Sequence, residues 1–184
     1  NVRQIGLATL SFESARRMFP SGYLSDSIGK AAARTGNHRD PHTWDAGPGW
    51  GWGAQLLPYL EETGIDQQID FHQPLWSPAF ASAVGARVAT FLCPSVSGPS
   101  GPVIISDESG AEFSPSGGTL ALGRSHYVAS HGQESCWGEC GATQSGPVFT
   151  DIYTGATKNV QHQGDVSLVA DGPFYRGSRT RMRD

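Results

Sequence analysis

The stretch NVRQIGLATLSFESARRMFP, residues 1–20, decides how this chain folds. Its apolar side chains recur at steps of three and four residues, which predicts an amphipathic helix over residues 2–18. One face of this helix carries Val2, Ile5, Thr9, Phe12, Arg16 and Phe19, with Ala8 and Ala15 beside it. Pro20 ends the helix because the residue before a proline disfavours helical backbone, and Ser21-Gly22 makes the turn.

Neither end of the chain carries an ordinary terminal signal. No Ser, Thr or Asp stands before the helix to cap it. At the other end, residues 169–184 read VADGPFYRGSRTRMRD, and no Gly, Asn or Pro follows the four arginines. We therefore expect a piece of a longer protein, with a helix that begins upstream.

Composition predicts a single loop-rich domain over residues 1–184. Hydrophobic residues make up 38% and charged residues 16%, while the 24 Gly and 12 Pro favour many turns around a modest core. The net charge of −4 gives no electrostatic case for nucleic acid, which requires a basic face. The sequence holds no apolar run near the roughly 20 residues that span a bilayer, and no signal peptide.

The rest of the chain predicts short helices followed by short strands. Residues 25–49 form a long polar excursion, and residues 51–64 predict a second helix, interrupted by Pro58 and stopped by Gly64. A third helix is expected over residues 78–86. The β-prone runs cover residues 88–93, 103–106, 126–129, 148–150 and 166–170, with an exposed loop at 107–123.

This order of elements predicts the α+β class with an antiparallel sheet, since no late helix is available for parallel crossovers. We expect the N-terminal helix to lie across one face of that sheet, with Ile5, Phe12 and Phe19 turned towards it.

Two segments offer metal-ligating residues. Cys136, Cys140 and His131 could bind zinc, with Cys93 or His126 as a fourth ligand. However, the two cysteines are separated by three residues, and zinc knuckles usually have two. A disulfide between Cys136 and Cys140, a bridge from one of them to Cys93, or free thiols are the alternatives. The second segment, residues 38–45 (HRDPHTWD), matches no ligand spacing and favours a solvated polar loop.

The sequence contains no motif for nucleophilic catalysis, phosphate binding or dinucleotide binding. Glu61 and Glu62 are adjacent and point in different directions, which makes them a poor acid–base pair. Nothing in the sequence argues for an enzyme, and no cofactor is expected.

The glycine-flanked tryptophans of residues 49–53 (GWGWG) have two interpretations. Trp50 and Trp52, with Tyr23 and Trp44, could form a stacking platform for sugar rings. Alternatively both indoles pack into the core while glycine lets the backbone turn, and we favour this second interpretation.

Five motifs in order carry a family likeness: NVRQIGLATL (1–10), FPSGY (19–23), GPGWGWGAQLLPYLE (47–61), FLCPS (91–95) and DGPFYRGSRTRMRD (171–184). Through them the chain resembles the pilin-like proteins abundant in Planctomycetes, catalogued as domain of unknown function 1559. The resemblance spans nearly the whole chain. Residues 36–45 and 132–145 match none of the family's motifs.

The resemblance implies a pseudopilin-like structural protein. Members of this family typically carry an N-terminal leader with a prepilin-type methylation site and a membrane helix that runs into a segment similar to residues 1–19. Residues 20–184 would form the head, on the periplasmic side or at the cell surface, within a filament or secretion-type pseudopilus. Its partners would be other pilin-like subunits. The competing hypothesis is an extracellular polysaccharide-binding module that uses the exposed Trp and Tyr side chains.

The same resemblance bears on the cysteines. Pilin-like heads face compartments in which disulfides persist, so we predict a Cys136–Cys140 bridge. Cys93 would then remain as a buried thiol inside an apolar strand.

Overall fold

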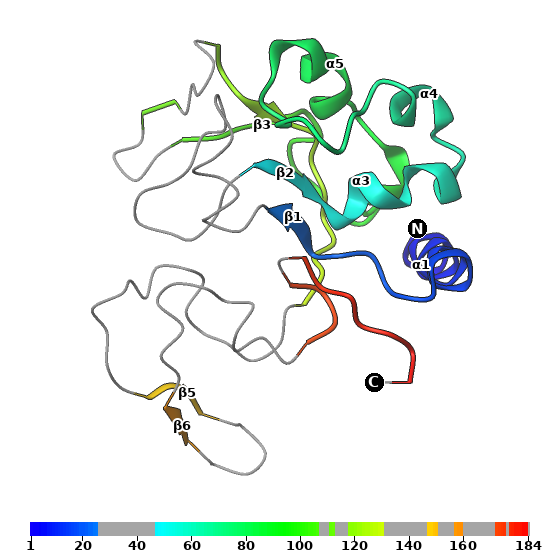
Figure 1. Cartoon of the computed structure of the whole chain (residues 1–184). Helices are drawn as coiled ribbons and strands as arrows, with labels where there is room; N and C mark the ends of the chain where they lie inside the picture. The colour runs from blue at the N-terminus through cyan, green and yellow to red at the C-terminus, as the bar shows by residue number, and fades with distance from the viewer. Residues whose placement is uncertain are drawn as a thin grey trace.

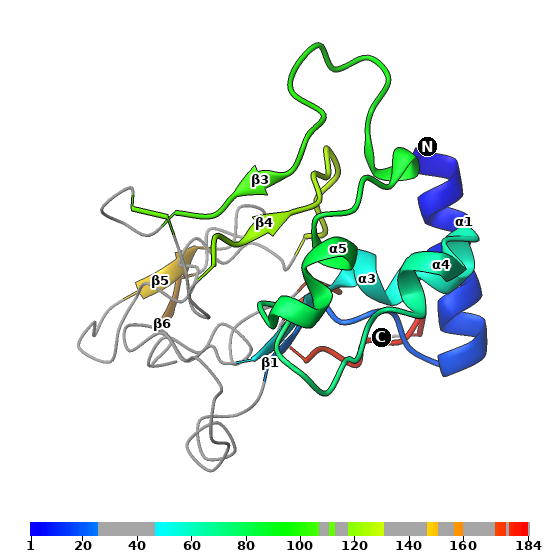
Figure 2. The same ribbon diagram turned by 90° about the horizontal axis from the view of Figure 1, so that it is seen from above.

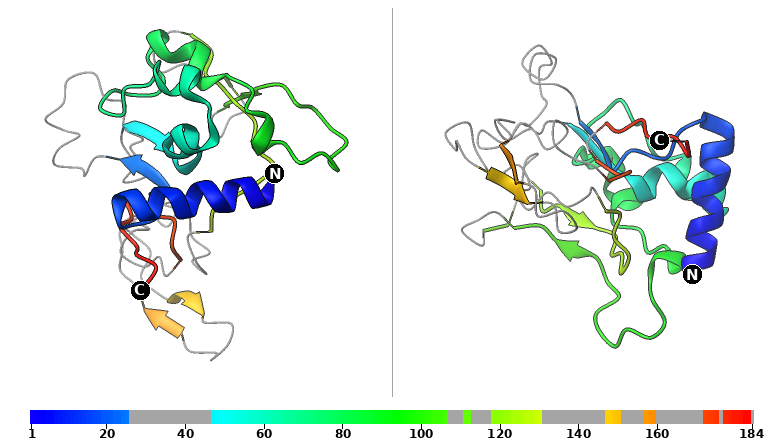
Figure 3. Two further views of the ribbon diagram at one scale, coloured as in Figure 1. Left: turned by 90° about the vertical axis from the view of Figure 1, so that its right-hand side faces the viewer. Right: turned by 90° about the horizontal axis from the view of Figure 1, so that it is seen from below.

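Helix α1, Val2–Arg16, lies along one flank of the computed structural model. Figure 1 shows it end-on, and the left view of Figure 3 shows its full length. The structure describes residues 1–25, 47–106, 111–112, 118–130, 147–150, 157–159, 172–175 and 177–183, with the backbone alone for 147–150 and 157–159. The helix ends two residues earlier than predicted, because Arg17 adopts left-handed backbone with φ 61°.

The inner face of α1 packs on two short helices. These are α3 (Trp52–Leu56) and the 3-10 helix η1 (Leu57–Leu60). Ala8 and Phe12 form a core cluster with Leu56, which is fully buried. The ring of Phe12 meets Tyr59 edge-on, with 5.7 Å between ring centroids. The predicted helix is therefore confirmed, and these contacts hold it in place.

The predicted helix over residues 51–64 is broken into three pieces. After η1 the chain turns at Glu61, whose φ is 64°, and α4 follows at Thr63–Asp66. Pro58 has no N–H to donate, which favours a tight 3-10 turn over a continuous α-helix. The expectation that Gly64 stops the helix is wrong, because Gly64 lies inside α4.

The next predicted helix and the strand after it had different outcomes. The third helix is confirmed as η2 (Pro78–Phe80) followed by α5 (Ala81–Val84). The strand expected at residues 88–93 is instead the 3-10 helix η3 (Ala89–Phe91). Val88 and Phe91 are both buried in a cluster with Leu57. Their spacing of three residues belongs to a helical turn and not to a strand.

The described strands form three antiparallel pairs, which confirms the α+β class. They are β1 (Tyr23–Ser25) with β2 (Pro48–Gly51), β3 (Val103–Ile104) with β4 (Ala121–Leu122), and β5 (Pro147–Thr150) with β6 (Thr157–Asn159). Residues 126–129 form no strand, and residues 166–170 lie outside the described part of the chain.

The surface beneath α1 differs from the expected sheet. The helix contacts α3, η1 and η3, and Figure 2 shows β3 and β4 set apart from it. Its first turn is tied to the end of η3, because the side-chain amide of Asn1 donates to the backbone oxygens of Ala89 and Leu92. The described strands are too short to offer the broad face that Phe12 needs, and the α3–η1 helices supply it.

The two ends of the chain run side by side. The N–H of Phe19 donates to the oxygen of Thr180 over 2.7 Å, and that of Gly22 donates to Tyr175 over 3.0 Å. The hydroxyl of Ser21 donates to the oxygen of Ser178 over 2.8 Å. A Cβ on Gly22 would lie 2.6 Å from the oxygen of Phe174, so this seam requires glycine there.

Candidate functional site

Trp50 is a core residue. Only 4% of it is exposed, and its ring meets Phe71 and Phe80 edge-on. The indole Nε1 donates to the backbone oxygen of Gln73 over 2.9 Å. With both the ring and its polar tip satisfied inside the fold, Trp50 presents no face to a sugar ring.

A carboxylate fixes the turn that receives this indole. Asp70 accepts hydrogen bonds from the N–H of His72 over 2.9 Å and from the side-chain amide of Gln73 over 2.8 Å. These two bonds, the His72 bond first, hold the pKa of Asp70 below its ordinary value. Asp70 therefore has a structural role beneath Trp50.

Among the described residues, the other candidates for sugar stacking do not join Trp50 in an exposed platform. Trp52 is half-buried and meets Phe91 edge-on at 5.4 Å between ring centroids. Tyr23 is half-buried in β1, and Trp44 lies outside the described residues. The two indoles thus belong to the packing interpretation of the GWGWG motif.

Trp52 also lines an apolar cavity of about 310 Å³ between α3, α5 and β4. Leu57, Val88 and Phe91 line it too, and Arg124 is the one ionisable side chain among the described residues of its wall. The guanidinium Nε of Arg124 donates to the oxygen of Gly101. Among the described residues of this wall, no nucleophile is paired with a base.

Cys93 sits in a hydrogen-bonded turn and not in the expected strand. It is half-buried, and its N–H donates to Nδ1 of His126 over 3.0 Å. Hydrogen bonds from the Ser95 backbone and from the Tyr127 hydroxyl lower the pKa of the Cys93 thiol. Burial, and the same bond to Cys93, raise the pKa of Tyr127.

The other metal and disulfide predictions fall outside the described residues. These comprise His131, Cys136 and Cys140 as well as the His38–Asp45 loop. In the part of the chain that is described, no group of three or more His, Cys, Asp or Glu side chains could hold a metal ion.

The outer face of α1, which consists of Arg3, Gly6, Leu7, Leu10 and Ser14, points away from the core. Leu7 is 54% and Leu10 48% exposed. A Cβ on Gly6 would meet nothing within 4 Å. The left view of Figure 3 looks onto the helix from the solvent side. This face combines two leucines with a glycine, the kind of surface on which another helix packs closely.

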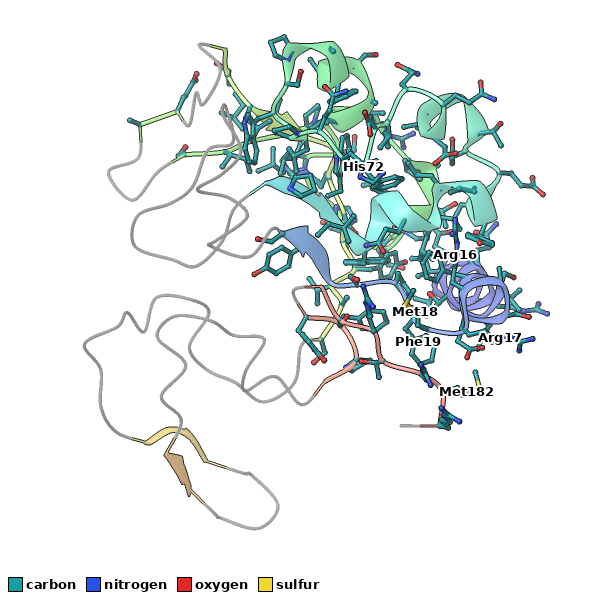
Figure 4. All side chains as sticks on the ribbon, viewed as in Figure 1. Arg16, Arg17, Met18, Phe19, His72 and Met182 are labelled. Atoms are coloured by element: carbon teal, nitrogen blue, oxygen red, sulfur yellow. The ribbon has the colours of Figure 1, made fainter. Side chains whose placement is uncertain are left out.

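A second surface lies where α1 meets the C-terminal segment. We call it the arginine surface, and it comprises Arg17, Arg179, Arg181 and Arg183, all exposed. Figure 4 shows Arg17 and Met182 at one corner of the molecule, near Phe19, whereas Arg16 lies on the other side of α1, where it lines a hollow with Tyr59. The sequence showed the C-terminal arginines but gave no signal of which segment they would meet.

A membrane-crossing helix is not found among the described residues, since no helix there is both long and apolar enough.

A family model described as "Protein of unknown function (DUF1559)" matches residues 1–184. No curated protein and no solved structure matches the chain.

Proposed function

The chain belongs to the DUF1559 family, and on this premise we propose that it is the head domain of a pseudopilin-like structural protein. Such a head is held by a membrane helix upstream of α1 and lies in the periplasm or at the cell surface. Its partners are further copies or other pilin-like subunits. The mechanism is packing, not catalysis: the helix sets the spacing of the subunits and the head supplies the surface.

One observation carries the proposal, namely that α1 is apolar on two opposite sides. Ala8 and Phe12 anchor the helix in the head, while Leu7 and Leu10 point outwards. A helix that only had to cover the core would need one apolar stripe, with polar residues opposite. The second apolar stripe is accounted for if neighbouring subunits cover it.

The size of the outer face sets how strongly it can associate. Two half-exposed leucines contribute on the order of 1 kcal/mol each when a neighbour covers them. That is too little to hold two free subunits together at micromolar concentration. We therefore expect residues 1–184 alone to be monomeric, with assembly appearing once a membrane helix concentrates and aligns the copies.

Substitution on the outer face tests the proposal in the full reading frame, expressed in membranes. We expect Leu10→Lys to reduce the recovery of assembled subunits, because a charged side chain cannot be buried between helices without a partner. Leucine and lysine have similar helix propensities, so the head stays folded. Val128→Lys is the matched control, since Val128 is 93% exposed and is not part of α1.

Assembly that is unchanged by Leu10→Lys, or equally weakened by Val128→Lys, would contradict the proposed role of α1. The reading frame upstream of Asn1 gives a separate test. We expect roughly 20 apolar residues there, and their absence would remove the membrane anchor from the proposal.

A further inference from the structure

The apolar cavity between α3, α5 and β4 is bordered by residues of the core. Figure 2 shows these three elements next to one another. Leu57, Val88 and Phe91 on its wall are 4%, 6% and 8% exposed, and they form one core cluster. Protein interiors are normally close-packed, with few voids larger than a water molecule. A cavity of about 310 Å³ therefore leaves one side of this cluster without packing partners among the described residues.

The cavity is suited to an apolar molecule of limited size. Trp52 and Phe91 supply an aromatic side of its wall, and Leu122 with further aliphatic side chains supplies most of the rest. An apolar cavity of roughly 150 Å³ holds benzene, so this one has room for on the order of ten to twelve non-hydrogen atoms. Water hydrates such a wall poorly, which favours its replacement by an apolar ligand.

Arg124 stands at the wall of this cavity in a fixed position. The backbone N–H groups one residue before it and two residues after it donate to the oxygens of Val84 and Phe91, over 2.7 and 2.9 Å, respectively. The guanidinium is held as well, since its Nε donates to the oxygen of Gly101 over 3.0 Å. The backbone and the side chain of Arg124 are thus both in place before any ligand arrives.

The bond to Gly101 uses only part of the guanidinium of Arg124. The N–H groups of its two terminal nitrogens have no partner among the described residues. The described wall also contains no carboxylate that could neutralise the charge. Two parallel terminal N–H groups match the two oxygens of a carboxylate. Arg124 therefore presents a positioned cation beside an apolar cavity.

We propose that this cavity binds a small apolar monocarboxylate, with its hydrocarbon part inside the cavity and its carboxylate on the guanidinium of Arg124. A neutral hydrocarbon would leave the cation unpaired, and a purely polar anion would leave the cavity unfilled. An apolar amine would bring a second positive charge to Arg124. A monocarboxylate of roughly ten non-hydrogen atoms suits both the size of the cavity and its charge.

Calorimetry of residues 1–184 with octanoate tests the proposal, because octanoate has roughly ten non-hydrogen atoms. We expect one saturable site with a Kd on the order of 0.1 mM. Acetate lacks the apolar chain and octylammonium carries the opposite charge, so neither should bind there. Octanoate should also raise the midpoint of thermal unfolding, because it binds the folded head and not the unfolded chain.

Two variants separate the contribution of the guanidinium from that of the cavity. Arg124→Gln should weaken octanoate binding roughly ten-fold. Arg87→Gln is its matched control and should change nothing, because Arg87 is exposed and does not line the cavity. Ala54→Leu places a larger side chain on the wall from α3 and should abolish octanoate binding. The same change at the exposed Ala15 of α1 should leave binding unchanged.

Four results would overturn the proposal: no saturable octanoate binding, equal binding of octylammonium, equal weakening by Ala54→Leu and Ala15→Leu, or full affinity in Arg124→Gln. The last variant remains decisive if Ala54→Leu does not fold, because Arg124 belongs to neither core cluster of the described residues. These measurements use the free head in solution and leave Leu10 intact. Their failure is therefore separate from a failure of subunit assembly, which is measured in membranes with Leu10→Lys.

Discussion

Ala8 and Phe12 on the inner face of α1 are 2% and 9% exposed, whereas Leu7 and Leu10 on its outer face are 54% and 48% exposed. These residues lie within two turns of the same helix and are all apolar. The inner pair packs against Leu56 and thereby contributes to the stability of the head. The outer pair belongs to neither core cluster of the described residues, so its apolar surface is available to another molecule. One helix thus has a face that serves folding and an opposite face that the proposed function assigns to association.

The largest expected difference between the faces is in stability. Phe12→Ala should lower the free energy of unfolding by roughly 3–5 kcal/mol, because it leaves a cavity against Leu56 and Tyr59. Leu10→Ala should lower it by less than about 1 kcal/mol, as expected for a surface position. Urea unfolding of the two variants measures both values. Equal losses would show that the two faces are not distinct.

Two glycine substitutions test the comparison between buried and exposed surfaces further. Gly22→Ala should destabilise the head by about 1–3 kcal/mol, because its Cβ collides with the backbone of Phe174 at the seam between the two ends. Gly6→Ala should stabilise it by roughly 0.5–1 kcal/mol, because alanine is the better helix former and the space is open. Thermal unfolding distinguishes the loss of stability expected for Gly22→Ala from the gain expected for Gly6→Ala. A destabilising Gly6→Ala would mean that the outer face is already packed in the monomer.

The smallest expected effect is on the pH at which the Cys93 thiol reacts. This thiol reports on the inner face of α1. Cys93 follows Leu92, whose oxygen accepts a bond from Asn1 at the start of α1. Because the pKa of Cys93 is lowered, its alkylation by iodoacetamide should reach half-maximal rate at a lower pH than that of an ordinary thiol. Tyr127→Phe removes one of the hydrogen bonds and should move the midpoint upwards. Leu10→Ala should leave it unchanged, and a shift in that variant would contradict the separation of the faces.

The sequence predicted what depends on local patterns. The helix of residues 2–16 was predictable because Ala8 and Phe12 recur at helical spacing. The run VATFLC has β-prone composition, yet Val88 and Phe91 are buried three residues apart and form a 3-10 turn. Composition gave the wrong prediction there, because tertiary packing decides the secondary structure of such short apolar segments.

Non-local pairing was beyond the reach of local patterns. Nothing near Phe19 signals that its N–H pairs with Thr180, and so the arginine surface could not be assembled from the sequence. The outer face of α1 could be predicted more easily from the sequence, since Leu7 and Leu10 lie off the stripe that carries Ala8 and Phe12. A second apolar stripe is the signal that would have revealed it.

Photo-cross-linking in membranes tests the association role of α1 most directly. A photoreactive side chain placed at Leu10 in the full reading frame should yield cross-linked copies, while the same group at Val128 should not. Both positions are exposed in the head, so accessibility alone predicts no preference between them. Cross-links between copies from position 10 alone are the predicted result. Cross-links from position 128 alone, or from neither position, would contradict the assignment of the outer face to subunit packing.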